Sequence, residues 1–160
     1  MPTKKNLKYF MRSTEPEIVT APGPASFKDE DGNVIMFEIK VLSQETITKI
    51  NNNYRKRTMA TDKKGNPLVF NGEVIWKTER DSARASRHMI VEALQYPDLK
   101  DPDLMAHYGC VDVTEMPMKV FSRADEFSHV SKIVMAALGL GSDIGTEGDT
   151  DEKNLDDAKN

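Results

Sequence analysis

Apolar residues occupy every second position over residues 35–41, and this alternation predicts a strand that buries one face. The sequence Asp-Gly-Asn at 31–33 comes directly before it, so we expect a hairpin with the region around Phe27. A second hairpin is predicted at the Asn-Gly pair 71–72, between the triplets LVF and EVI, because this pair favours a two-residue turn. The first half of the chain is therefore expected to form antiparallel hairpins or a small sheet.

Helical spacing of apolar residues, with a capping residue in front, predicts helices in five segments. These run from Ser43 to about Arg57, over residues 82–96, from Pro102 to Gly109, from Thr114 to Phe121 and from Ser122 to Gly139. Asp101 before Pro102 is a clear start, because Asp accepts free N–H groups and Pro at the first position loses no hydrogen bond. The predicted fold is α+β, with a small N-terminal antiparallel sheet or hairpins and a helical C-terminal half.

Length and charge divide the chain into three parts. Residues 1–16 are polar and basic and are expected to be a flexible N-terminal arm, whereas residues 17–140 are expected to form one α+β domain. Residues 141–160 hold seven acidic residues, two lysines and almost nothing to bury, so we expect a disordered tail of net charge −5. The other 140 residues have a net charge of +1 and give no general electrostatic reason to bind nucleic acid.

Composition also limits the location of the protein. No apolar run approaches the ~20 residues needed to cross a bilayer, and the first residues lack the apolar region of a secretory signal. The single cysteine, Cys110, excludes an internal disulfide framework and a cysteine-based zinc site within one chain. We therefore expect a cytosolic protein without a membrane partner. We find no internal repeat.

Residues 87–109 concentrate side chains that often serve as ligands or bases: His88, Glu92, Asp98, Asp101, Asp103 and His107. The first two lie four apart on the polar side of a predicted helix, which indicates an exposed pair worth about 0.3–0.5 kcal/mol. An interface contact and a metal site are the alternatives, but a metal needs further ligands, and His107 lies beyond a proline-broken loop. The aspartates suit helix starts better than a calcium loop, whose glycine and distal glutamate are missing at this spacing.

Other catalytic patterns are absent from the sequence. It has no G-x-S-x-G motif and no phosphate-binding glycine loop. Cys110 follows the Gly109 stop, away from the helix N-terminus or cationic neighbour that activates a thiol. The basic cluster at 54–57 (YRKR) is expected at a helix C-terminus, where it complements the helix dipole, with a patch for phosphate or acidic groups as the alternative. We predict neither an enzyme nor a cofactor or metal site.

The last predicted helix is the best candidate for a binding surface. Its apolar stripe, widened by Ile133 and Leu140, spans roughly 160°, whereas packing on one domain usually needs about 100°. A well-buried terminal helix explains this width, and an excess left for another protein chain is the alternative. The residues assigned to partner binding are Phe127, Val130, Ile133, Val134, Leu138 and Leu140.

Three blocks of sequence, taken in their order and spacing, resemble a known family. NLKYFMR near the start, RHMIVEALQYPDLKDPDLMAHYG in the middle, and DVTEMPMKVFSRADEFSHV followed by ALGL are similar to the XkdN-like tail assembly chaperones of bacteriophages and prophages. The resemblance covers about residues 5 to 140 and leaves the acidic tail outside. None of the blocks is a catalytic motif.

The resemblance implies a protein that acts in the cytoplasm of the bacterial host during tail morphogenesis. Such chaperones are expected to bind the tape measure protein, to keep it soluble and to be absent from the finished tail. Self-association would add avidity, and a longer form of the chain made by ribosomal frameshifting is a further expected partner. The alternative is a minor structural tail protein that is retained in the virion.

Overall fold

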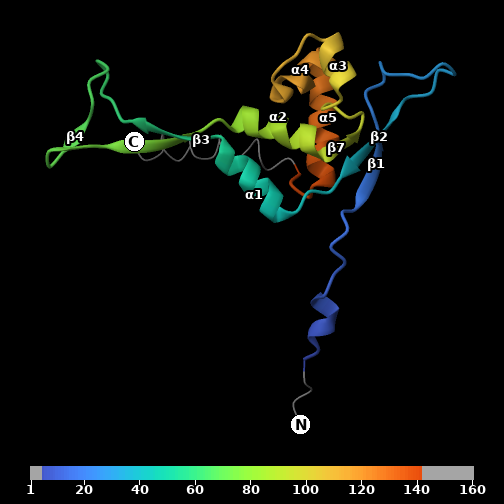
Figure 1. The fold of residues 1–160 in the computed structure, drawn as a ribbon, viewed down its shortest axis with the longest axis horizontal. Coiled ribbons are helices and arrows are strands. Elements are labelled where there is room, and N and C mark those ends of the chain that lie inside the picture. The colour runs from blue at the N-terminus through green and yellow to red at the C-terminus, as the bar shows by residue number, and fades with distance from the viewer. Residues whose placement is uncertain (1–4, 142–160) are drawn as a thin grey trace, which may run out of the picture.

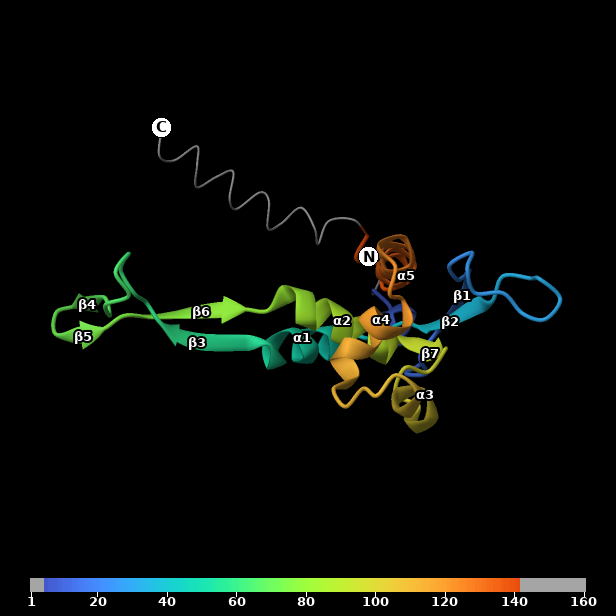
Figure 2. The same ribbon diagram turned by 90° about the horizontal axis from the view of Figure 1, so that it is seen from above.

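A computed structural model describes residues 5–141. Within this range, two long segments project from a central body (Figure 1 and Figure 2). One is the N-terminal segment with the 3-10 helix η1, Leu7–Phe10. The other is a long hairpin of β3, Arg55–Met59, and β6, Trp76–Arg80, whose tip contains β4, Val69–Phe70, and β5, Glu73–Val74. The predicted acidic tail lies outside the described residues from residue 142 onward.

The body combines a three-stranded antiparallel sheet with helices. Its strands, in the spatial order β1-β2-β7, are β1, Ile18–Pro22, β2, Met36–Lys40, and β7, Leu94–Tyr96. Its helices are α1, Gln44–Asn53, α2, Ser82–Ala93, α3, Pro102–His107, η2, Val113–Glu115, α4, Met116–Val120, and α5, Ala124–Ala137. The predicted α+β fold, with hairpins in the first half and helices in the second, is confirmed.

Strand β2 and helix α2 form the centre of the hydrophobic core. Phe37 and Ile39 on β2 are 2% and 0% exposed and alternate with exposed residues, as the sequence pattern predicts. Helix α2 packs against α1, α4, α5 and β2, and its buried residues include Met89 and Ile90. The ring of Phe121, after α4, lies 5.8 Å from that of Phe37 and joins the helical half to the sheet.

Two predicted helices are shorter than their periodicity indicates. The helix predicted to about Arg57 ends at Asn53, the third of three consecutive asparagines, a residue type with low helix propensity. The residues that follow pair with β6. The helix predicted over residues 82–96 ends at Ala93, and β7 pairs with β2 instead. Pro97 favours an extended residue before it, which opposes a longer helix.

The starts and stops in the second half agree more closely with prediction. The Asp101 carboxylate accepts the N–H groups of Asp103 and Leu104 at 2.9 and 3.1 Å, and Gly109 has a φ of +58° at the predicted stop. The last helix starts slightly later than expected, since Arg123 and not Ser122 holds the N-cap position.

One turn geometry occurs twice, although no repeat was expected. Residues 29–33 (DEDGN) and 62–66 (DKKGN) each begin with an aspartate that accepts the N–H groups two and four residues later at 2.9 Å. The glycines at position four have φ values of +82° and +84°. In the second turn, hydrogen bonds led by the one from the Asn66 N–H lower the pKa of Asp62. Each turn is therefore held by hydrogen bonds within its own five residues.

Gly23 gives a test of the packing between the β1–β2 connection and the core. A methyl group at this position would lie 2.5 Å from the Phe37 ring. Gly23→Ala is therefore expected to lower the free energy of unfolding by about 1 to 3 kcal/mol in urea denaturation. In a double-mutant cycle with Phe37→Leu the two losses should be less than additive, and strict additivity would contradict the proposed clash.

Candidate partner-binding surface

The apolar stripe of α5 faces the inside of the body. Val130 and Val134 are 0% exposed and Leu138 is 8% exposed, and all three belong to the core. Phe127, Ile133 and Leu140 are partly buried and pack against the same core. Much of the predicted width is thus used within the chain, and in this conformation a partner reaches only the partly exposed three.

The hairpin carries a larger exposed apolar surface, which sequence reasoning missed. We call residues 55–80 the arm; it projects along the longest dimension of the molecule (Figure 1). Seven large apolar side chains on it are 38–68% exposed: Met59, Leu68, Val69, Phe70, Val74, Ile75 and Trp76. Monomeric proteins rarely leave such side chains gathered on one element unless a partner covers them.

The two faces of the arm differ in charge. Paired residues of antiparallel strands share a face, so one face presents Arg55 with Arg80, Arg57 with Thr78 and Met59 with Trp76. We call this the arginine face. The guanidinium of Arg57 lies 5.1 Å from the centre of the Trp76 ring, and the two paired strands place no acidic residue on this face.

The opposite face of β3 and β6 is nearly balanced. It carries Lys56, Lys77 and Glu79, and the Lys77 ammonium lies 2.8 Å from the Glu79 carboxylate, which lowers the pKa of that carboxyl. The arm as a whole holds seven basic and three acidic residues, a net charge of +4. The excess positive charge is therefore concentrated on the arginine face, nearest the body.

The tip of the arm confirms the second predicted hairpin. Asn71 and Gly72 have φ values of +51° and +79°, the left-handed conformations that a two-residue Asn-Gly turn requires. Val69 pairs with Val74 and Phe70 with Glu73 across this turn. Val69 and Val74 are both exposed, so the far end of the arm is apolar.

The side chains that follow the second of the two turns lack the cover that those after the first turn have. Ile35 and Phe37 follow the first turn by two and four residues after its asparagine, and both contribute to the core. Leu68 and Phe70 occupy the same positions after the second turn but are 40% and 68% exposed. The same local structure is thus covered by helices in the body and uncovered in the arm.

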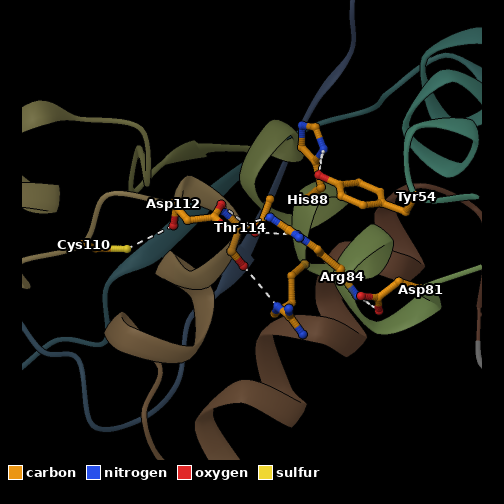
Figure 3. Close-up of polar contacts among 8 residues, drawn as sticks. Tyr54, Asp81, Arg84, His88, Cys110, Asp112 and Thr114 are labelled. Carbon is orange, nitrogen blue, oxygen red and sulfur yellow. Dashed lines mark hydrogen bonds and ion pairs between the residues drawn. The ribbon is translucent and has the colours of Figure 1, made fainter. Parts of the chain in front are cut away.

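Side chains from three distant segments fix the root of the arm (Figure 3). The Asp81 N–H donates to the Tyr54 carbonyl at 3.0 Å and closes the hairpin where it meets α2. The Tyr54 hydroxyl is 2.7 Å from His88 Nδ1, and burial raises the pKa of this hydroxyl. The guanidinium of Arg84 lies 5.6 Å from the centre of the Tyr54 ring.

Arg84 continues this network to the loop before η2. Its Nη2 donates to Asp112 at 2.7 Å and its Nε to the Thr114 hydroxyl at 3.3 Å. Hydrogen bonds from the hydroxyl and N–H of Thr114, and the charge of Arg84, hold the pKa of Asp112 below its ordinary value of 3.8. Because these groups bond to each other, the network acts as a structural clamp that orients the arm.

The histidine-rich stretch does not assemble into one site. His88 Nε2 lies 3.5 Å from the Glu92 carboxylate, so the predicted pair exists, but the His88 side chain is only 21% exposed because Tyr54 covers it. His107 lies on α3, and Asp101 is used as its N-cap. Across residues 5–141 we find no group of three or more histidine, cysteine or acidic residues suited to a metal ion.

Two further expectations are settled by position. Tyr54 is the C-cap of α1, as expected for a cluster at a helix C-terminus, but Arg55, Lys56 and Arg57 begin β3 and do not lie in the last turn of the helix. The thiol of Cys110 is partly buried and donates to the Asp112 carbonyl at 3.0 Å, which is a structural role. No helix within the described range is both long and apolar enough to span a bilayer.

The clamp predicts a pH-dependent stability. Asp112→Asn removes the charge that Arg84 and Thr114 stabilise. We expect the free energy of unfolding to fall by about 1 kcal/mol at pH 7, below the usual range for charged hydrogen bonds because the pair is exposed. The folded carboxyl has the lower pKa, so its contribution is present above pH 3.8 and is lost as pH falls below that value. Urea unfolding of the wild type and the variant at pH 7 and at a pH below 3.8 measures this difference in stability. A difference between wild type and variant that is constant with pH would contradict it, and Asp31→Asn serves as an exposed control.

Sequence comparison with known proteins identifies the family of the chain. Residues 7–158 match the family model described as phage XkdN-like tail assembly chaperone protein. The match extends into the acidic tail, so the expectation that the tail lies outside the family is wrong. The chain is 28% identical over 141 residues to the phage-like element PBSX protein XkdN of Bacillus subtilis (strain 168), covering 87% of this chain and 88% of that protein.

A second relative supplies a structural match. The uncharacterized protein YqbN of Bacillus subtilis (strain 168) is 27% identical over 141 residues, covering 87% of each chain. A crystal structure of YqbN matches the fold with a TM-score of 0.65 at 22% identity, over 86% of this chain and 98% of that one. With the family match spanning nearly all of the described residues, the chain belongs to the XkdN-like phage tail assembly chaperones.

Proposed function

We propose that this protein binds the tape measure protein of its phage in the cytoplasm of the bacterial host and keeps it soluble until the tail tube encloses it. It acts by binding and catalyses no reaction. Membership of the tail assembly chaperone family supports a role in tail assembly, and the single observation that carries the binding mode is the uncovered apolar surface of the arm.

An isolated two-stranded hairpin is marginally stable in water, so an arm of this length gains from a partner along its face. The partner that fits is a helix with an apolar stripe. In the body, α2 and α5 pack against β2, which carries Phe37, and a helix of the client would cover Leu68 and Phe70 in the same way. Long helical segments are what a tape measure protein is expected to offer.

Charge adds direction to this contact. The arm is apolar at its tip, and its arginine face is cationic near the root, so the arm favours a client helix whose apolar stripe continues into acidic residues. The partly exposed Phe127, Ile133 and Leu140 of α5 stay proposed as a second, smaller contact, whereas Val130, Val134 and Leu138 would contribute only by holding α5 in place.

Substitution on the arm should separate binding from folding. Val69→Asp with Trp76→Asp changes two exposed side chains of the arm, and we expect client affinity to fall by about 10- to 100-fold, because aromatic anchors dominate such interfaces. The matched control, Val111→Asp with Met118→Asp, changes two exposed apolar side chains off the arm and should bind normally. The measurement is the soluble fraction of co-expressed tape measure protein, with pull-down from that fraction. Equal binding by both double variants would reject the arm as the client site.

The composition of purified phage particles distinguishes a chaperone from a minor structural tail protein that is retained in the virion. A chaperone is released before the tail is complete, so quantitative mass spectrometry should find this chain scarce or absent relative to the tube protein. A minor structural tail protein would instead be present at a fixed number of copies per particle, and that result would overturn the proposal.

A further inference from the structure

The N-terminal segment presents a second exposed apolar surface, separate from the arm. Residues 5–16 are all exposed, and Leu7, Tyr9, Phe10 and Met11 are 68–79% exposed. Within the described residues, the first backbone hydrogen bond from this end to the body is made by the Glu17 carbonyl, which accepts from the Val41 N–H at 2.8 Å. The segment therefore carries large apolar side chains that its own body does not cover.

Local structure arranges these side chains for docking. The Asn6 side chain caps the 3-10 helix η1 by accepting the Lys8 N–H at 3.0 Å. Residues three apart eclipse in a 3-10 helix, so Leu7 and Phe10 share one side. Lys5, Lys8 and Arg12 accompany them, and the sequence contains no acidic residue from Lys5 to Thr14. The segment is an apolar ridge with positive charge beside it.

An open groove between β7 and α3 has the complementary character. Its volume is about 520 Å³, within the range of pockets that hold small ligands. Apolar surface dominates it, and its principal lining residues are Tyr96, Pro97 and Leu104 together with Asp98, Asp101 and Asp103. His107 also lines it. Strand β7 is an edge of the sheet, so the groove lies at an uncovered border of the body.

We propose that the N-terminal segment of one copy docks in the β7–α3 groove of a second copy. Leu7 and Phe10 would enter the apolar part, while Lys5, Lys8 and Arg12 would face the three aspartates. Charge complementarity and the matching apolar surfaces select a second copy of the chain as the occupant, since every copy has both the N-terminal segment and the groove. The contact is separate from the proposed client site on the arm.

Backbone geometry favours a second copy over the same chain. Glu15 precedes Pro16, so it is biased toward an extended conformation, and the proline ring fixes its own φ. Both residues oppose a reversal at the point where the segment leaves the sheet. Figure 1 shows the segment running away from the body on the side opposite α3, so the segment does not lie along the groove of its own chain.

Light scattering after size-exclusion chromatography of the full chain tests this without a client. The wild type should assemble with increasing concentration. Two double variants should each remain a single chain at concentrations at least tenfold above that at which the wild type assembles. The donor variant, Leu7→Asp with Phe10→Asp, removes the apolar ridge of the segment. The groove variant, Asp98→Lys with Asp103→Lys, reverses the charge of the groove. Val111→Asp, another exposed apolar position, should assemble as the wild type does.

Mixing identifies the pairing. The donor variant keeps its groove and the groove variant keeps its segment, so an equimolar mixture should form a complex limited to two chains. A synthetic peptide of residues 1–16 should bind the donor variant and not the groove variant. A wild type that stays a single chain and a peptide that binds neither variant would overturn the proposal, as would assembly that persists in the donor variant.

Discussion

Burial of one face of helix α2 is the constraint on which the rest of the structure depends. The helix packs against α1, α4 and α5, and it is joined directly to β6 before it and to β7 after it. A single twelve-residue element therefore fixes where the arm leaves the body and where the third strand joins the sheet. The clamp around Arg84 also fixes the direction of the arm. Its groups are hydrogen-bonded to one another, so the loss of one group would leave its partners without a bond.

Much of the local structure could be predicted because its signals are short-range. The alternation around Phe37, the Asn-Gly turn and the Asp101-Pro102 helix start each depend on a few neighbouring residues, and the structure has all three. Strand β3 could not be predicted in this way. Its residues RKRTM show no alternation of apolar and polar positions, and its partner β6 lies about twenty residues further along the chain.

The exposed apolar surface of the arm was missed for the same reason, namely that it depends on residues far apart in the sequence. A wide stripe on α5 looks like an excess of apolar surface until one knows that the sheet, α2 and the segment around Phe121 all surround it. Conversely, Phe70 follows the same turn as the buried Phe37 but lies where nothing covers it. Exposure is a property of the assembled fold, so periodicity alone could not distinguish these two phenylalanines.

The polar side chains divide into those used inside the molecule and those offered outside. Tyr54, Arg84, His88 and Asp112 satisfy each other, so residues that are often catalytic elsewhere serve here to orient a projection. The arginine face and the N-terminal segment keep their charges beside exposed apolar groups. Such a distribution suits a protein that acts through extended contacts with other chains.

The pairing of β3 with β6 limits how the length of the arm can change. Inserting one residue in each strand would exchange the two faces, moving the arginines to the opposite side, whereas inserting two in each would preserve them. Each permitted step lengthens the arm by about 7 Å. The reach of the molecule is therefore adjustable only in discrete increments, and these leave the anchored end unchanged.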